Sequence, residues 1–173
     1  MKKRAAKNKR GIKIEIPGFG DRHIKTILSD FTGTLSCGGK LTMGVGECLI
    51  ELARSVDIHI ITADTNNTAE NELKDLPIEL HRLSGETGHD CQKRDHLQKS
   101  DLVPSAVAVF GNGNNDRLLL KAVKDAGGLA IAVENGEGCA LDAILNAHLF
   151  VAGALNALDL LLKTNRCKAT LRF

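Results

Sequence analysis

The sequence contains no tryptophan and no tyrosine, and its five phenylalanines hold the aromatic fraction to 3%. A chain without these rings offers no obvious aromatic platform on which a base or a sugar could stack, so its ligand has to be inferred from polar residues. No apolar run approaches the ~18 residues that a membrane-spanning helix needs. We therefore expect a soluble, cytoplasmic protein.

Paired cysteines are also missing. The chain has five cysteines, an odd number, and no two of them form a Cys-x-x-Cys pair. This usage argues against a disulfide framework and against a cysteine-based zinc site. We expect buried or incidental thiols at Cys37, Cys48, Cys91, Cys139 and Cys167.

Acidic residues are absent from the first ten positions, which hold six lysines and arginines, whereas the rest of the chain has a formal charge of −4. We predict a disordered basic tail over residues 1–11. A contact between this tail and nucleic acid or another anionic surface is the alternative, but no aromatic or glycine residues alternate with the basic ones.

The 173 residues suit one domain, and apolar runs alternate with helical patterns from residue 24 onward. Such alternation is typical of a parallel sheet covered by helices on both faces. We therefore predict an α/β fold, a three-layer Rossmann-like parallel sheet in a single domain over residues 12–166, followed by an extension over 167–173. The predicted strands are 11–16, 24–29, 58–62, 78–83, 106–110, 129–133 and 149–151, and the predicted helices are 44–55, 67–75, 89–100, 116–125, 138–147 and 154–163.

Polar residues follow three of the predicted strands, where ligands of such sheets bind. The first strand is followed by Asp-Phe-Thr-Gly-Thr-Leu at residues 30–35, the second ends in Thr62, and the third leads into Gly-Asn-Gly-Asn-Asn-Asp at residues 111–116. Lys93 lies in the segment before that third strand. We expect these groups to meet at one edge of the sheet.

The combination suits phosphoryl transfer. A carboxylate can form an aspartyl-phosphate, and hydroxyl and backbone N–H groups can hold phosphoryl oxygens. A lysine offsets negative charge, and Mg²⁺ binds to one or two carboxylates together with the phosphate. Each residue also has an ordinary structural interpretation, as a turn, a helix cap or a surface lysine, so only their order and spacing favour a phosphate site.

The motifs at these strand ends resemble those of the haloacid dehalogenase-like (HAD) superfamily. The Asp-x-Thr-Gly-Thr pattern at residues 30–34 is similar to the phosphorylation site of P-type ATPases, and Lys93 stands 19 residues before Asn112, as in their catalytic domain. The likeness covers about residues 24–163 and points to soluble P-type ATPase-like HAD hydrolases. Neither gap between the motifs holds a large cap domain, so the resemblance implies an open site with at most a minimal cap.

The resemblance implies a role for each matching residue. Asp30 would be the nucleophile, and Thr62 and Lys93 would bind and stabilise the phosphoryl group. The substrate would be phosphorylated, with a macromolecule as one option. The implied catalytic residues are Asp30, Thr62 and Lys93; the phosphate-binding residues are Thr32, Gly33, Thr34, Thr62, Ala63, Lys93 and Asn115; the Mg²⁺ ligands are Asp30, Thr32, Asn112 and Asp116, with Asp64 as an outer-shell helper.

Two positions depart from the usual phosphatase pattern. Thr32 stands where most of these phosphatases have a second aspartate that protonates the leaving group, and Asn112 stands where they have a metal-binding aspartate. General acid–base catalysis contributes about 10²–10⁴ in rate, so we expect slow dephosphorylation and weakened metal binding. A non-catalytic phosphate-binding or regulatory protein on the same fold stays open, as does a nucleic-acid-associated protein anchored by its tail.

Overall fold

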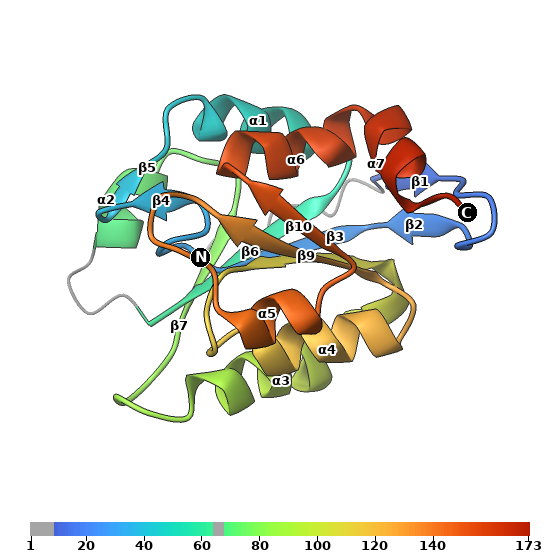
Figure 1. Ribbon diagram of the computed structural model, residues 1–173. Helices are drawn as coiled ribbons and strands as arrows, with labels where there is room; N and C mark the ends of the chain where they lie inside the picture. Colours follow the sequence, from blue (N-terminus) through green and yellow to red (C-terminus); the bar gives the residue numbers. More distant parts are fainter. Residues whose placement is uncertain (1–8, 64–67) are drawn as a thin grey trace.

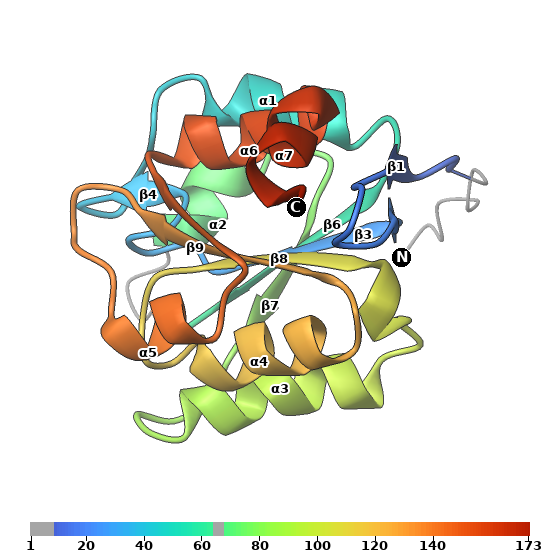
Figure 2. The same ribbon diagram turned by 45° about the vertical axis from the view of Figure 1, so that its right-hand side comes forward.

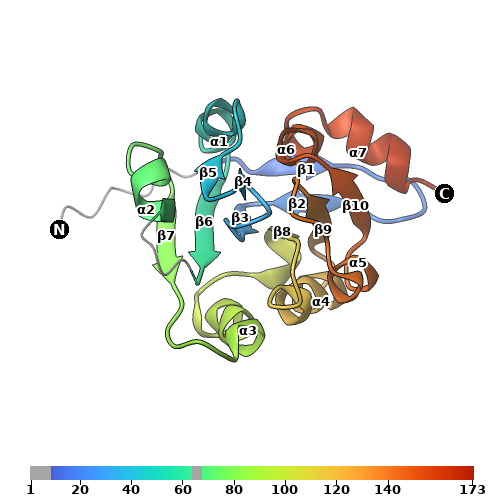
Figure 3. The ribbon, with the colours of Figure 1, turned by 60° about the vertical axis from the view of Figure 1, so that its left-hand side comes forward.

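The computed structural model describes residues 9–63 and 68–173. In this part of the chain six strands form one sheet in the order β10-β9-β8-β3-β6-β7, and every neighbouring pair is parallel. The first of them in the sequence, β3, lies near the middle (Figure 3). Their bounds are β3 (Thr26–Ser29), β6 (Asp57–Thr62), β7 (Glu79–Arg82), β8 (Val107–Gly111), β9 (Leu129–Glu134) and β10 (Leu149–Ala152).

The burial of each strand follows its place in the sheet. Every residue of β3 and β8 is buried, as are the first five residues of β9, because helices cover both faces of these strands. The edge strand β7 is half-buried or exposed throughout. Long apolar runs therefore predict the central strands well, and the predicted α/β parallel-sheet fold is confirmed.

Helices pack on both faces of the sheet (Figures 1 and 2). One apolar cluster joins the sheet to α1, α2, α6 and α7, and a second joins the opposite face to α3, α4 and α5. The helices are α1 (Val45–Leu52), α2 (Thr68–Leu73), α3 (His89–Lys99), α4 (Arg117–Asp125), α5 (Leu141–Leu145), α6 (Ala154–Leu162) and α7 (Thr164–Leu171), with a short 3₁₀ turn at Pro104–Ala106.

Two small antiparallel hairpins lie at opposite ends of the sheet (Figure 1). The first, β1 (Ile12–Ile14) with β2 (Arg22–Ile24), leads into the amino end of β3. The second, β4 (Ser36–Cys37) with β5 (Lys40–Leu41), follows the carboxyl end of β3. This second hairpin, which we call the flap, lies at the end of the sheet where the polar residues that follow the strands gather.

The predicted boundaries of the domain need correction at both ends. The N–H of Gly11 donates to the carbonyl of Ser55 over 3.0 Å, and Lys9 forms an ion pair with Asp57 at 2.9 Å, so residues 9–11 pack on the domain. Helix α7 crosses the predicted boundary at residue 166 and buries Cys167 and Leu171 in the core. The sequence does not predict this helix, because only these two of its side chains are buried and the rest of the segment is mostly polar.

One further correction concerns α5. The sequence predicts a helix over residues 138–147, but α5 begins only at Leu141, because Gly138 adopts a left-handed conformation with φ 84°. The residues of the basic tail before Lys9, Asp64, and the first residue of the helix predicted over 67–75 lie outside the described residues. No helix in the described ranges is long and apolar enough to cross a membrane.

Candidate active site

A cavity of about 630 Å³ opens at the carboxyl ends of the strands. Its walls come from the ends of β3, β6 and β8, from the flap, and from loops that follow β6 and β9. The residues that line it are Asp30, Thr32, Gly38, Gly39, Thr62, Ala63, Thr68, Asn112, Gly113, Asn115 and Glu137.

Asp30 is held rigidly at the end of β3. Its backbone N–H donates to the carbonyl of Phe110 on the neighbouring strand over 3.0 Å, and its side chain is only 4% exposed. The chain then turns sharply around Phe31, whose carbonyl accepts backbone N–H groups from the next residues of the loop, namely Thr34, Leu35 and Ser36. This turn brings Thr32 to the cavity while the Phe31 ring anchors the loop in the core.

Two loops meet at Gly33. Gly33 has φ 71°, and a Cβ at this position would lie 2.3 Å from Nδ2 of Asn112. The Thr34 hydroxyl donates to Oδ1 of Asn112 over 3.2 Å, and Nδ2 of Asn112 donates to the carbonyl of Gly138 over 3.2 Å. Glycine is therefore required at position 33, and the Asn112 amide links the loops that follow β3, β8 and β9.

Lys93 reaches the site from α3 and is completely buried. Its Nζ donates to Oδ1 of Asp30 over 2.7 Å and to Oδ1 of Asp116 over 2.6 Å. Burial lowers the pKa of Lys93, but Asp116 and Asp30 outweigh that effect and raise the pKa to about 12. The ammonium group is therefore charged at every pH of interest and bridges two carboxylates.

Asp30 and Asp116 differ in their surroundings although Lys93 joins them. Burial raises the pKa of Asp30 to about 6, with the nearby Asp116 adding to the effect and Lys93 opposing it. Asp116 stands at the start of α4, and its Oδ2 accepts the backbone N–H groups of Asn112 and Gly113 at 3.0 Å each. Asp30 faces the cavity, whereas Asp116, which is 1% exposed, lies behind the loop that it holds in place.

No protein-family model matches the chain. Over 78 residues the chain is 42% identical to the uncharacterized protein MJ0073 of Methanocaldococcus jannaschii, a match that covers 45% of this chain and 78% of that protein. The two proteins belong to one family.

Solved structures resemble the whole domain at low sequence identity. The 3-deoxy-D-manno-octulosonate 8-phosphate phosphatase of Moraxella catarrhalis, in complex with a magnesium ion, a phosphate ion and KDO, matches with a TM-score of 0.63 at 16% identity, over 85% of this chain and 90% of that one. The cobalt-bound phosphatase YrbI of Haemophilus influenzae matches with a TM-score of 0.63 at 13% identity, over 87% and 94%. The HAD-like protein SP0104 of Streptococcus pneumoniae matches with a TM-score of 0.57 at 17% identity, over 79% and 97%. The chain has the haloacid dehalogenase-like fold.

Within this HAD fold the residues selected from the sequence come together. Thr62 ends β6 with 1% exposure and lines the cavity with Ala63, as Asn115 does from the loop after β8. Lys93 and Asp116 are buried behind the cavity wall, where Lys93 contacts Asp30 and Asp116 contacts Lys93 and the loop after β8. Thr34 is also buried, where its hydroxyl is engaged by Asn112.

The sequence reasoning did not find Glu137. This carboxylate lines the cavity from the loop after β9, and its Oε1 accepts the backbone N–H of Gly38 in the flap over 2.7 Å. The two residues are 99 positions apart, and no motif or spacing marks them. The only signal was the position of residues 135–138 directly after a strand of the predicted sheet.

Proposed function

We propose that the protein is a phosphohydrolase or phosphotransferase that works slowly through an aspartyl-phosphate on Asp30 and uses Mg²⁺. The observation that carries this proposal is the position of Asp30, a buried carboxylate at the cavity with Lys93 bound to its Oδ1. Lysine fixes one oxygen of the carboxylate and leaves Oδ2 to attack phosphorus. The likeness to phosphatases with the HAD fold supports the same reaction class.

The charges at the cavity favour a bound cation. Among the described residues that line it, Asp30 and Glu137 are acidic and none is basic. A phosphate dianion would be repelled there unless a cation lay between it and the carboxylates. Oxygen ligands suited to Mg²⁺ are present in the carboxylate of Asp30, the carbonyl of Thr32 and the amide oxygen of Asn112. Bound there, the metal would shield the negative charges of the nucleophile and the phosphoryl group.

Asp116 has a supporting role in this proposal. Both of its oxygens already accept hydrogen bonds, from Lys93 and from two backbone N–H groups. It therefore fixes the conformation of the loop that carries Asn112. It also contributes negative charge to the site from its buried position behind the cavity wall. Asn112 lines the cavity from that loop, together with Gly113 and Asn115.

The proposed reaction has two displacements. In the first, Oδ2 of Asp30 forms a bond to phosphorus, the bond from phosphorus to the ester oxygen breaks, and the leaving oxygen takes a proton from water. In the second, water attacks phosphorus, the bond to Asp30 breaks, and inorganic phosphate leaves with the carboxylate restored. An alcohol in place of water would make the second step a transfer. The phosphoryl oxygens would be held by the Thr62 hydroxyl and by groups of Thr32, Ala63 and Asn115 at the cavity wall. Lys93, Gly33 and Thr34 do not line the cavity and would support the site from behind it, Lys93 through its positive charge.

Slow turnover follows from Thr32. Thr32 occupies the position from which an acid would protonate the leaving group, and a threonine hydroxyl cannot donate that proton at neutral pH. Good leaving groups such as aryl and acyl phosphates need no such help. The cavity, with only a short hairpin as flap, suits a phosphorylated small molecule whose other end extends into solvent.

A phosphate-binding or regulatory protein without turnover is the second candidate. It is favoured by the same Thr32 and by Asn112, whose amide is engaged at both ends with Thr34 and Gly138. In that case the site would bind phosphate, and any aspartyl-phosphate formed on Asp30 would not be hydrolysed.

The first experiment measures hydrolysis of an aryl phosphate and of acetyl phosphate with Mg²⁺ for the wild type and for Asp30→Asn. We expect the variant to lose at least about 10²-fold in rate, because the nucleophile is gone. Asp101→Asn, at an exposed position just after the end of α3, is the matched control and should keep the wild-type rate. Equal rates for wild type and Asp30→Asn, or no turnover by either, would reject hydrolysis of these substrates.

Two further measurements separate the candidates. Beryllium fluoride with Mg²⁺ should form a stable adduct on Asp30 in the wild type but not in Asp30→Asn. Thr32→Asp should raise the rate on alkyl phosphates by about 10²-fold or more if only the acid is missing. An adduct without any gain from Thr32→Asp favours the binding protein, and the absence of an adduct argues against a competent nucleophile.

A further inference from the structure

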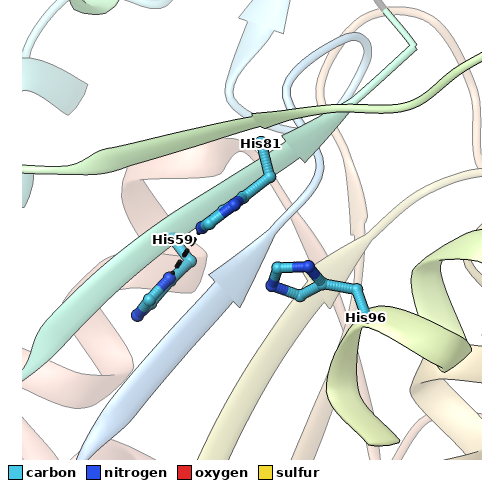
Figure 4. Close-up of side chains that lie close together, drawn as sticks. All are labelled: His59, His81 and His96. Carbon is cyan, nitrogen blue, oxygen red and sulfur yellow. Dashed lines mark hydrogen bonds between the residues drawn. The ribbon is translucent and has the colours of Figure 1, made fainter. Parts of the chain in front are cut away.

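Three of the six histidines gather on the α3 side of the sheet, away from the cavity (Figure 4). His59 comes from β6, His81 from β7 and His96 from α3. In the parallel register of β6 and β7, His59 stands opposite Glu79, and His81 follows Glu79 two residues later on β7. The side chains of His59, Glu79 and His81 therefore project from the same face of the sheet. Helix α3 lies over that face and adds His96 (Figure 4).

The imidazole nitrogens lie close together. One ring nitrogen from each of the three residues lies within 4.8 Å of the other two, and Nδ1 of His59 is 2.9 Å from Nε2 of His81. Oε2 of Glu79 is 3.5 Å from Nδ1 of His59 and 3.8 Å from Nε2 of His81. Three imidazole nitrogens therefore lie close enough to share one metal ion, and the Glu79 carboxylate lies beside two of them.

We propose that His59, His81 and His96 bind a transition-metal ion of the zinc class, with Glu79 or water as the fourth ligand. Three neutral imidazoles select Zn²⁺, Co²⁺, Ni²⁺ or Cu²⁺ over Mg²⁺, which prefers oxygen ligands. This site is therefore separate in place and in chemistry from the cation proposed beside Asp30.

The spacing is compatible with tetrahedral coordination after small side-chain rotations. Metal–nitrogen bonds of about 2.0–2.1 Å place two tetrahedral ligands about 3.3 Å apart. The pair His59–His81 at 2.9 Å has to open slightly, and the His96 nitrogen lies within 4.8 Å of both. Metal binding would break the hydrogen bond between His59 and His81. Neither ring would have to lose its proton, because each neutral imidazole can carry its hydrogen on the nitrogen that does not face the metal.

The surroundings of the cluster allow an ion to enter and to be held. All three histidines are half-buried, so the nitrogens are partly desolvated and still accessible. Burial lowers the pKa of each, which keeps the rings neutral at pH 7 and agrees with a ligand role. A bound ion would join the edge strand β7 to α3, the helix that places Lys93 one turn before His96.

The experiment titrates metal-free full-length protein with Zn²⁺ by calorimetry and with Co²⁺ by visible absorption. We expect one ion per chain, a Co²⁺ spectrum typical of tetrahedral nitrogen ligation, and a higher melting temperature with Zn²⁺ than with chelator. Replacing any one histidine of the cluster, as in His59→Gln, His81→Gln or His96→Gln, should weaken binding by more than about 10-fold.

Two controls locate the site. His89→Gln changes a histidine of the same helix outside the cluster, and Asp30→Asn removes the carboxylate of the cavity; both should bind Zn²⁺ like the wild type. Glu79→Gln distinguishes the fourth ligand, with a weaker affinity if the carboxylate ligates and an unchanged one if water does.

The proposal fails if fewer than one ion binds per chain in the wild type, or if the cluster variants bind as tightly as His89→Gln. Variants that do not fold leave the wild type as the test. In that case, imidazole resonances of His59, His81 and His96 should shift together at one equivalent of Zn²⁺ while those of His23 and His148 stay. Shifts confined to other histidines would overturn the proposal.

Discussion

Helix α3 places two polar side chains against the sheet, three residues apart, and they enter very different clusters. Lys93 enters a charged triad with Asp30 and Asp116 that is almost wholly buried, with both of its hydrogen bonds to the carboxylates at 2.7 Å or less. His96 enters a group of half-buried imidazoles in which one hydrogen bond joins His59 and His81.

The difference concerns what each cluster requires of its members. In the triad one ammonium group compensates two carboxylates away from water, so loss of Lys93 leaves uncompensated buried charge. In the histidine cluster the rings are neutral and partly hydrated, so loss of one costs little unless an ion is bound. The triad is built to hold a nucleophile in place, and the histidines have freedom to rearrange around a ligand.

The largest effect should come from Lys93→Met. Without the ammonium group, Asp30 and Asp116 face each other in a buried site, and the free energy of unfolding should fall by about 3–5 kcal/mol. Denaturant unfolding measures the loss. Lys99→Met, an exposed lysine of the same helix, should change stability by less than about 0.5 kcal/mol. If both substitutions cost the same, the triad does not stabilise the fold.

The second prediction compares the two carboxylates. Asp116→Asn weakens hydrogen bonds to Lys93 and to two backbone N–H groups and should cost about 2 kcal/mol. Asp30→Asn should cost less than about 1 kcal/mol, because burial disfavours the charged form that the substitution removes. Denaturant unfolding of the two variants beside the wild type decides the order. The reverse order would mean that Asp30, and not Asp116, is the structural carboxylate.

The sequence could predict the triad only in part, for physical reasons. Asp30 directly follows the strand predicted over residues 24–29, and the rule that ligands meet at strand ends selects it directly. Lys93 gives a weaker signal, since a lysine on a polar helix is normally solvated, and its selection rested on its place before the third strand and on the resemblance to a known family. Glu137 and the histidine cluster were missed because their proximity depends on loop paths and strand register that local patterns do not encode.

The third prediction concerns His96→Leu in the presence of chelator. Because His96 is neutral and half-buried, an apolar side chain of similar size should change the free energy of unfolding by less than about 1 kcal/mol in either direction. Thermal and denaturant unfolding, with and without Zn²⁺, check this. A much larger loss in chelator would mean that the ring itself, and not a bound ion, supports the packing of α3 on β7.

The smallest effect is the pH dependence of stability. Burial lowers the pKa of His59, His81, His96 and His148, the last to about 4. The unfolded chain then binds more protons than the folded one as pH falls below about 6.5, so stability decreases toward pH 4. For His148 burial is the largest cause, with Lys124 and Arg22 adding to it. A hydrogen bond acts in the same direction, since its Nδ1 accepts the backbone N–H of Ala130 over 3.1 Å and cannot do so when protonated.

Asp30 works in the opposite direction. Its pKa, raised to about 6, makes the folded state bind the extra proton between pH 6 and 4, which adds stability as pH falls. Because one carboxylate opposes four histidines, the net slope should still be a loss toward acid. Denaturant unfolding from pH 7.5 to 4.5 in chelator gives this slope. Asp30→Asn should make it steeper and His96→Leu shallower, each by less than one proton, and identical slopes in all three proteins would show that neither cluster titrates on unfolding.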